Sequence, residues 1–368
     1  MVAGHVCLDI TPVFSSKNKV DALGDILAPG KLINVGTADI HTGGAVANTG
    51  LALKTLGADV TLAAKIGNDQ FGQIVSRIFS SYGCEDGLIM TEGVDTSYSV
   101  VIAIPGIDRV FLHNPGANHS FCSADITEHM LEGISHFHIG YPPLMRGLYQ
   151  NKGAELVAIM KKAKASGATT SLDMAAVDPG SESGQVDWEG VLVDTLPYVD
   201  FFVPSVEELG FMLSKELYSK WTERANGGDI TQFINIEDEV SPLAERMLKM
   251  GVGGLLIKCG SKGMYYRTSD SESMKNLCAE YDLSPEQWLS KEGFVDSFYQ
   301  PNVLSATGAG DTSIAAFLTS MMRGKKLSRC VELAAATGAC CVASLDALSG
   351  LCPLEDLEAR IEAGWIVK

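Results

Sequence analysis

Hydrophobic and polar positions follow two different periods along the first half of the chain. Residues 45–56 carry apolar side chains at helical spacing, and Gly57 follows them where a helix commonly ends in a left-handed residue. Residues 60–66 place apolar side chains at every second position, which is typical of a strand. A longer helical pattern at 148–165 is followed by a short strand-like segment at 170–172. This alternation of strands and helices predicts an α/β fold with a mostly parallel sheet.

Four other segments depart from this pattern. Residues 100–104 and 110–112 are strand-like and flank a turn, so they predict a β-hairpin. The stretches near 211–240 and 268–300 are polar, with aromatic residues interleaved among the polar ones. We interpret these two stretches as insertions that carry short helices of their own.

The composition narrows the possible classes of function. A chain of 368 residues with 46% apolar and 20% charged side chains is long enough to form a sizeable globular core. Its formal net charge of −17 argues against a nucleic-acid partner, because binding to a phosphate backbone needs a basic surface. We expect no membrane span and no signal peptide, since the required apolar runs are missing.

The cysteine and histidine residues give little sign of a metal site. The nine cysteines lack the CxxC or Cys/His spacing of zinc sites, and most of them lie in apolar runs. We interpret them as reduced thiols and therefore expect a cytoplasmic protein. His136 and His138 flank Phe137 in a predicted strand, and we interpret both as structural.

The strongest local signal is the segment Thr307-Gly308-Ala309-Gly310-Asp311, which leads into an amphipathic helix. Its small residues present consecutive backbone N–H groups at a helix start, where unpaired amides and the helix dipole bind anions. The segment is not a Walker A loop, because no Gly-Lys-Ser/Thr follows the glycines. Asp311 lies where a phosphoryl group would also lie, and it could accept a proton from an attacking hydroxyl. On local features alone it could equally cap the helix.

A second signal lies at Gly43-Gly44, directly before the helix predicted at 45–56. Two adjacent glycines allow a ligand to approach the backbone closely. Asn48, one helical turn later, offers an amide donor and an amide acceptor that suit hydroxyl groups. Taken alone, this segment would also fit an ordinary helix-entry turn.

Together the two segments resemble the paired signatures of the PfkB family of ribokinase-like carbohydrate kinases. The resemblance extends over nearly the whole chain, because the sequence carries further segments similar to the family's motifs. These are Asp9 at the end of a first strand and residues 66–72, 114–118, 171–173, 204–208 and 258–263. The resemblance implies an α/β fold, a ribokinase-like αβα sandwich with a mostly parallel central sheet and a small β-sheet lid.

The same resemblance implies a division of the chain into two parts. We expect the main αβα kinase domain to comprise residues 1–10, 41–95 and 119–368, with the nucleotide site in its C-terminal half. The discontinuous lid is expected at residues 11–40 and 96–118.

The resemblance further implies an ATP-dependent kinase in which each motif has a role. Asp311 would be the general base that activates a hydroxyl of the sugar, and the amides of Gly308, Ala309 and Gly310 would hold the transferring phosphoryl group. Glu208 would position Mg²⁺ through water. The residues implied to contact the sugar are Asp9, Gly43, Gly44 and Asn48. Those implied to lie near the nucleotide are Ser205, Lys258, Gly260, Gly263 and Thr307, although Lys258 could equally be a strand-end lysine in solvent.

Three segments depart from the family pattern. Ser305 and Ala306 replace the usual Asp-Thr pair, whose aspartate helps to hold a monovalent cation, so potassium activation is doubtful. Ser205 replaces the asparagine of the Pro-Asn-x-x-Glu motif, which shortens or removes one polar contact near the phosphates. The dipeptide Ala45-Val46 is similar to the fructokinase-like branch rather than to ribokinases proper.

Two alternative functions stay open at this point. One is a nucleoside kinase of the same fold, for which Tyr98 and Phe111 in the lid could stack on a base. The other is a sugar-binding family member with weakened catalysis, suggested by Ser205 and Ser305. A dinucleotide oxidoreductase is excluded, because no Gly-x-Gly-x-x-Gly turn follows a predicted strand.

The expected partner is a small-molecule sugar, and the edges of the lid could pair into a homodimer. The sequence does not specify which sugar, because a single hydroxyl or methylene of pocket shape decides that choice. Arg109 and His113 in the lid are interpreted as exposed hairpin residues rather than as ligands of an acidic sugar.

Overall fold

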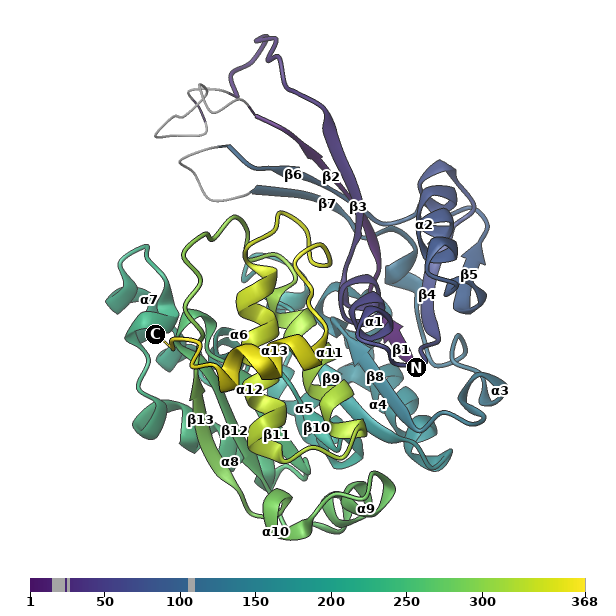
Figure 1. Cartoon of the computed structure of the whole chain (residues 1–368). Helices are drawn as coiled ribbons and strands as arrows, with labels where there is room; N and C mark the ends of the chain where they lie inside the picture. The colour runs from purple at the N-terminus through teal and green to yellow at the C-terminus, as the bar shows by residue number, and fades with distance from the viewer. Residues whose placement is uncertain (15–23, 25–26, 105–109, 368) are drawn as a thin grey trace.

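A nine-stranded sheet forms the centre of the computed structural model, which describes residues 1–14, 24, 27–104 and 110–367 (Figure 1). The strands from β11 to β5 pair in parallel, whereas β12 and β13 are antiparallel to their neighbours. Their order across the sheet is β13 (Glu292–Asp296), β12 (Gly263–Thr268), β11 (Gly254–Lys258), β10 (Phe201–Phe202), β9 (Thr169–Asp173), β8 (His136–Gly140), β1 (Val2–Gly4), β4 (Leu62–Gly67) and β5 (Leu88–Thr91).

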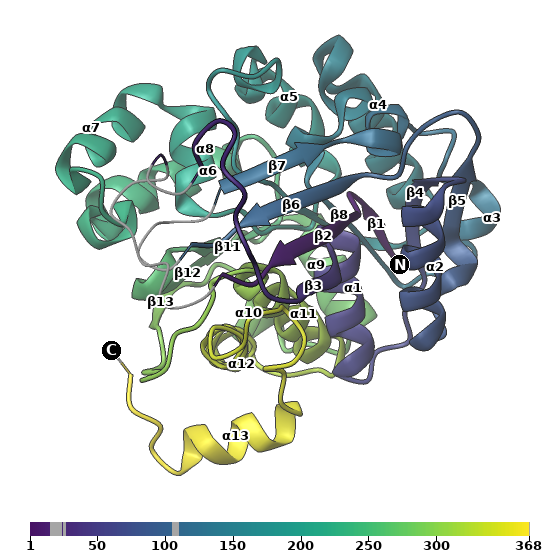
Figure 2. The same ribbon diagram turned by 90° about the horizontal axis from the view of Figure 1, so that it is seen from above.

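Helices cover both faces of this sheet, as the view from above shows (Figure 2). The helices packed on one face are α1 (Ala45–Thr55), α2 (Gln70–Ser81), α9 (Glu272–Glu280), α10 (Pro285–Trp288), α11 (Ala309–Met322), α12 (Leu327–Cys341) and α13 (Leu354–Glu362). Those on the other face are α3 (Glu128–Leu131), α4 (Arg146–Ala165), α5 (Trp188–Thr195), α6 (Val206–Leu213), α7 (Lys215–Ala225) and α8 (Ser241–Lys249). None of the helices in the described residues has both the length and the apolar character needed to cross a membrane.

The two hydrophobic cores are separated by the alternation of side chains along each strand. In β11, Leu255 and Ile257 enter the core under α4 to α8, whereas Leu256 between them enters the core under α1, α11 and α12. Phe201 and Phe202 of β10 divide in the same way. This is the period of two expected for a strand that is buried on both faces. The predicted αβα sandwich with a mostly parallel sheet is thereby confirmed.

A second, four-stranded sheet forms the predicted lid and stands beyond the strand ends of the main sheet (Figure 1). Its order is β3 (Ala38–Gly43), β2 (Cys7–Pro12), β6 (Tyr98–Ile102) and β7 (Val110–Asn114). β6 and β7 form the predicted hairpin, whose turn lies outside the described residues together with residues 15–23 and 25–26 of the predicted lid. Cys7–Ile10 and His41–Gly43 also pair within this sheet, although the predicted boundaries placed them in the main domain.

Three details differ from the sequence prediction. Asp9 lies within β2 of the lid sheet and does not close the first strand of the main sheet, which ends at Gly4. The polar stretch near 268–300 contains β13, an edge strand of the main sheet whose residues are mostly exposed or half-buried. The helix predicted at 148–165 is interrupted at 150–153, where the backbone leaves the helical conformation.

His136 and His138 lie on β8 and take part in a buried polar network with the next strand, β9. The His136 ring lies 2.7 Å from the Thr169 hydroxyl and 2.8 Å from the Ser171 hydroxyl, which also lies 2.8 Å from the His138 ring. Both histidines are buried, and burial lowers the pKa of each ring. Neutral rings paired with hydroxyls have the structural role that the sequence analysis assigned to them.

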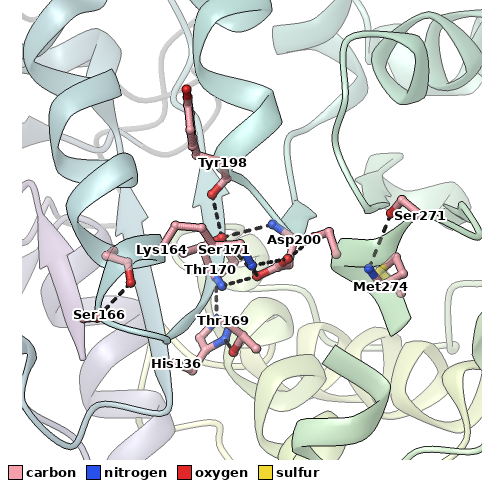
Figure 3. Close-up of polar contacts among 12 residues, drawn as sticks. His136, Lys164, Ser166, Thr169, Thr170, Ser171, Tyr198, Asp200, Ser271 and Met274 are labelled. Atoms are coloured by element: carbon pink, nitrogen blue, oxygen red, sulfur yellow. Dashed lines mark hydrogen bonds and ion pairs between the residues drawn. The ribbon is translucent and has the colours of Figure 1, made fainter. Parts of the chain in front are cut away.

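A second buried polar cluster nearby is centred on Asp200, which is fully buried just before β10 (Figure 3). Its carboxylate accepts hydrogen bonds from the Lys164 ammonium of α4 at 2.5 and 2.6 Å and from the Thr170 amide of β9 at 2.7 Å. The Ser273 hydroxyl of α9 also donates to it. Asp200 therefore ties helices from both faces of the sandwich to the sheet between them.

We predict that Asp200→Ala lowers the free energy of unfolding by about 3–5 kcal/mol, because it leaves the Lys164 ammonium and a buried amide without their anionic partner. Urea unfolding would measure this change. The exposed Asp194 of α5 provides a matched control, and its replacement by alanine should change the unfolding free energy by less than about 0.5 kcal/mol. Equal effects of the two substitutions would contradict the role assigned to Asp200.

Candidate active site at the carboxyl ends of the parallel strands

The candidate site lies where the direction of chain progression across the sheet reverses. From β1 the chain proceeds through β4 and β5 in one direction, whereas β8, β9, β10 and β11 follow one another in the other direction. In open α/β sheets, ligands bind in the crevice outside the strand ends at such a point. The residues at or directly after these ends are His5 (β1), Tyr141 (β8), Asp173 (β9) and Lys258 (β11), and Ser205, three residues beyond β10, pairs with Lys258 in an isolated bridge.

Asp311 lies in the first turn of α11, and donors from two distant segments hold its carboxylate. The side-chain amide of Asn48 donates to Oδ2 at 3.0 Å, and the hydroxyl of Thr49 donates to Oδ1 at 3.3 Å. The hydroxyl of Tyr141 lies 2.8 Å from both oxygens. The N-cap position of α11 is Gly308, which has no side chain, so capping by Asp311 is not what the structure shows.

The backbone amides before Asp311 remain available to a ligand. Among the described residues no acceptor is found for the amides of Gly308, Gly310 and Asp311, whereas the amide of Ala309 donates to the Ala306 carbonyl at 3.4 Å. Free amides at the N-terminus of a fourteen-residue helix have the polarity that attracts phosphate. Three of the four amides from Gly308 to Asp311 are therefore free among the described residues, whereas that of Ala309, one of the amides expected to hold the phosphoryl group, is engaged.

A pocket of about 410 Å³ joins Asp311 to the ends of β9, β10 and β11. Its charged lining consists of the carboxyl groups of Asp173, Glu207, Glu208 and Asp311 and of one ammonium group, that of Lys258. Lys258 lies 2.7 Å from Asp173 Oδ1, and the side chain is only 13% exposed. The ammonium group is thus held inside the pocket and is not a strand-end charge in solvent.

Burial and crowding of like charges change the titration of this pocket. Burial raises the pKa of Asp173 to about 8; the Lys258 ammonium opposes this shift, and the carboxylates of Glu208 and Asp311 add to it. Burial would lower the pKa of Lys258, but the charges of Asp173 and Glu208 raise it above its usual value. Lys258 is therefore positively charged at neutral pH.

Ser205 and Glu208 form a capping box at the start of α6. The Ser205 hydroxyl accepts a hydrogen bond from the Glu208 amide at 3.2 Å, and Glu208 Oε2 accepts one from the Ser205 amide at 2.7 Å. The pattern Ser-x-x-Glu could have been recognised in the sequence as this motif. Oε2 of Glu208 is thus engaged locally, while the side chain lines the pocket.

The remaining residues predicted for the nucleotide lie at different places. Gly260 lines the pocket beside Thr231, which belongs to the predicted insertion near 211–240. Gly263 begins β12 and is not among the residues that line the pocket. Thr307 lies in the turn before α11, with its amide 3.1 Å from the Ser305 hydroxyl.

Predicted sugar-contacting residues lie close together where the lid strands β2 and β3 join the main domain. A Cβ atom at Gly43 would lie 2.2 Å from Asp9 Oδ2, and one at Gly44 would lie 2.5 Å from the His5 ring, so only glycine leaves room for these side chains. The carboxylate of Asp9 also accepts a hydrogen bond from the Cys7 thiol at 3.3 Å. The two glycines therefore provide close approach, as predicted, but protein side chains already use part of that space.

Aromatic rings connect the lid with the pocket. The His5 ring lies 5.5 Å from the His113 ring of β7 and 6.0 Å from the Tyr141 ring, measured between centroids. Burial lowers the pKa of His5 to about 3, so this ring is neutral, and neither of its nitrogens has a partner in the described part of the chain. His113 is exposed in the hairpin, as expected, and its ring lies 3.0 Å from the Ser99 hydroxyl, whereas Arg109 lies outside the described residues.

The donor set can be compared with the requirements of a divalent cation. No group of three or more His, Cys, Asp or Glu side chains in the described residues is arranged to hold a metal ion. Mg²⁺ is commonly bound by one or two carboxylates together with substrate phosphates and water, which needs no such group. The second carboxylate oxygen of Glu208, which has no hydrogen-bond partner in the part of the chain that the structure describes, fits a magnesium ion that is held mainly by a phosphate chain.

Sequence reasoning missed Tyr141, Thr49, His5 and the pairing of Asp173 with Lys258. No local motif marks Tyr141 or His5, because each is a single side chain directly after a strand. Their shared position at the carboxyl ends of strands around the reversal point was the one available signal.

The chain forms a nine-stranded αβα sandwich with a strand lid. The lid lies beside a helix N-terminus whose amides are suited to an anion, next to a buried aspartate. Together these features define a class of α/β enzymes that act on small molecules. The model of the pfkB family of carbohydrate kinases matches residues 6–351, and the chain belongs to this family. Fructokinase-1 of Oryza sativa subsp. japonica is 24% identical over 91% of this chain and 89% of the relative.

Two solved structures show that the fold is shared. The ribokinase of Arabidopsis thaliana complexed with ribose and ATP superposes with a TM-score of 0.70 at 18% identity, over 97% of this chain and 96% of the other. The nucleoside kinase of Methanocaldococcus jannaschii, an archaeal member of the ribokinase family, superposes with a TM-score of 0.65 at 20% identity, over 98% and 97%. The predicted family and the predicted ribokinase-like fold are confirmed.

We predict that the stability of the ligand-free wild type, relative to Asp173→Asn, falls as the pH rises from about 5 to 8. The pKa of Asp173 is raised to about 8 in the folded chain but is near 4 in the unfolded chain, so the folded state holds an extra proton in this window. The difference in unfolding free energy should decline by at most about 1.4 kcal/mol per pH unit. Urea unfolding at several pH values measures it, with substitution of the exposed Asp194 by asparagine as the control. A flat or rising difference would show that Asp173 is charged throughout.

Proposed function

We propose that this chain transfers the γ-phosphoryl group of ATP to a hydroxyl of a sugar or sugar derivative. One observation carries the proposal: the buried carboxylate of Asp311 lies at the helix start whose amides, those of Gly308, Gly310 and Asp311 itself, are free to bind an anion. An acidic side chain beside a phosphate site is unfavourable unless it takes part in the reaction. Membership of the carbohydrate kinase family supports this assignment.

In the proposed reaction Asp311 accepts the proton of the sugar hydroxyl as the hydroxyl oxygen attacks the γ-phosphorus atom. The bond from that phosphorus to the bridging oxygen breaks, and ADP leaves. The amides of Gly308, Ala309 and Gly310 would stabilise the equatorial oxygens, with Ala309 first giving up its contact to Ala306. The protein mainly positions the reactants and excludes water.

The nucleotide is proposed to occupy the acidic pocket toward Gly260, with Ser205, Thr307 and Gly263 around it. Lys258 would contact the phosphates while remaining paired with Asp173. Mg²⁺ bound with the phosphates would offset charge in this pocket, and Glu208 would hold it through water. Potassium dependence is proposed to be weak, because Ser305 supplies no negative charge.

The sugar is proposed to lie between Asp311 and the lid, against Asp9, Gly43, Gly44 and Asn48. The side-chain amide of Asn48 already donates a hydrogen bond to Asp311, so Asn48 would orient the base as well as the substrate. A nucleoside acceptor is less well supported by Tyr98, because its ring packs edge-to-face on Phe71 against the core, with ring centroids 5.2 Å apart, whereas Phe111 of β7 is exposed. A weakened sugar-binding protein is disfavoured by the three donors that hold Asp311.

Two further proposals concern the protein as a whole. A homodimer through the lid is supported by exposed apolar side chains at Ile40 of β3 and Leu112 of β7, the two outer strands of the lid sheet. A cytoplasmic location is proposed from the cysteine usage alone.

We predict that Asp311→Asn lowers kcat by at least about 10²-fold with little change in KM for ATP, as for the loss of a general base. ADP release across hexoses, pentoses, sugar acids and nucleosides would first identify the acceptor and then measure the variant. Circular dichroism and thermal melting should show that the variant is folded. Near-normal turnover in the folded variant would refute the assignment.

We predict that Asp9→Ala raises KM for the sugar by about 10–100-fold while KM for ATP stays nearly unchanged, because a buried sugar hydroxyl loses a charged acceptor. Asp39→Ala is a matched control on the neighbouring strand β3, where the aspartate is exposed and should contribute little. Sugars lacking single hydroxyls, tested against both variants, identify the hydroxyl concerned. A rise in KM for ATP instead would mean that the two sites are assigned in reverse.

A further inference from the structure

Three hydrogen-bond donors surround the carboxylate of Asp311. Two carboxylate oxygens offer about four lone-pair sites in total. Asn48 occupies one on Oδ2, Thr49 occupies one on Oδ1, and the Tyr141 hydroxyl contacts both oxygens at 2.8 Å. A general base needs a lone pair directed at the proton that it accepts. Of the three donors, only Tyr141 lines the pocket together with Asp311, so its hydroxyl lies on the side from which a substrate hydroxyl would approach the base.

The three donors differ in their freedom to move. Asn48 and Thr49 lie on α1, are 7% and 0% exposed, and belong to a helix whose first nine residues are all buried. Tyr141 lies in a turn after β8, is half-buried and lines the pocket. Its φ of 67° is in the left-handed region, which a bulky residue adopts only under strain. Tyr141 is the donor that can leave.

A receiving group for the displaced hydroxyl lies beside the ring. The neutral His5 ring is 6.0 Å from the Tyr141 ring between centroids, and both of its nitrogens lack partners among the described residues. The phenol itself stays protonated, because burial and the charge of Asp311 raise the pKa of Tyr141 well above its usual value. It can therefore donate either to Asp311 or to a neutral imidazole.

We propose that the Tyr141 hydroxyl occupies the place of the acceptor hydroxyl in the ligand-free enzyme and that the substrate's alcohol group displaces it. This inference rests on the proposed role of Asp311 as the base. Water is a poor competitor for the same place, because it makes none of the contacts with the lid that repay the displacement of the phenol. Tyr141 thus protects the base from water until a polyol arrives, which limits hydrolysis of ATP.

Removing the hydroxyl tests this directly. Tyr141→Phe should raise ATP hydrolysis in the absence of sugar by about tenfold and lower KM for the sugar several-fold, with KM for ATP unchanged, because a charge-assisted hydrogen bond no longer has to be broken. The additional hydrolysis should disappear in the double variant Tyr141→Phe/Asp311→Asn. Tyr141→Met is a second variant without the hydroxyl, should the phenylalanine variant lose stability.

Two controls isolate the effect. Tyr265→Phe removes a hydroxyl that donates to the carboxylate of Glu292 at 2.6 Å outside the pocket, and it should leave both activities unchanged. Thr49→Val removes a donor that does not have to move, so it should lower kcat without raising hydrolysis.

The possible outcomes distinguish a failure of the inference about Tyr141 from a failure of the proposed function. A fall in kcat for Tyr141→Phe with unchanged sugar KM and unchanged hydrolysis would mean that Tyr141 only orients the base, and displacement would be refuted. If the wild type phosphorylates no acceptor of the panel, the proposed function is wrong and the inference about Tyr141 is wrong with it.

Discussion

The arrangement of the site depends on the free energy required to bury the carboxylate of Asp311. An ionised carboxylate taken out of water is stable only where hydrogen-bond donors replace its hydration. Those donors come from α1 and from the end of β8, which lie 263 and 170 residues away along the chain. The packing of α1 beside α11 and the placement of β8 next to β1 are therefore conditions for the site as well as features of the fold. A change in either would leave a buried charge partly unsatisfied.

The local parts of this arrangement were predictable from the sequence. Small residues before an amphipathic helix identify an anion-binding helix start, and their place next to Asp311 depends only on neighbours along the chain. The alternation of residues 60–66 and the helix at 45–56 were likewise set by local periodicity. The family resemblance added the pairing of Gly43 and Gly44 with Asp311, which no local pattern contains.

The parts that depend on long-range contacts were not predictable in the same way. Tyr141 reaches Asp311 because β8 pairs with β1. Lys258 contacts Asp173 because their strands, β11 and β9, both pair with β10, which lies between them. β13 was hidden in a polar stretch, since an edge strand with little burial lacks a strong hydrophobic pattern. Asp9 was assigned to the end of a main-sheet strand because its position along the chain does not reveal that the strand bends away into the lid sheet.

The charge of the pocket explains why backbone amides, rather than basic side chains, face the proposed position of the transferring group. Four carboxyl groups and a single ammonium group line the pocket, and the ammonium group of Lys258 is already paired with Asp173. A further lysine beside Asp311 would form an ion pair with it and reduce its capacity to accept a proton. Amides at a helix start bind phosphoryl oxygens without carrying a net charge, so they form no ion pair with the carboxylate. The remaining negative charge of the phosphate chain must then be offset by a cation that arrives with the nucleotide, which is why an acidic pocket suits a metal–nucleotide complex better than the free nucleotide.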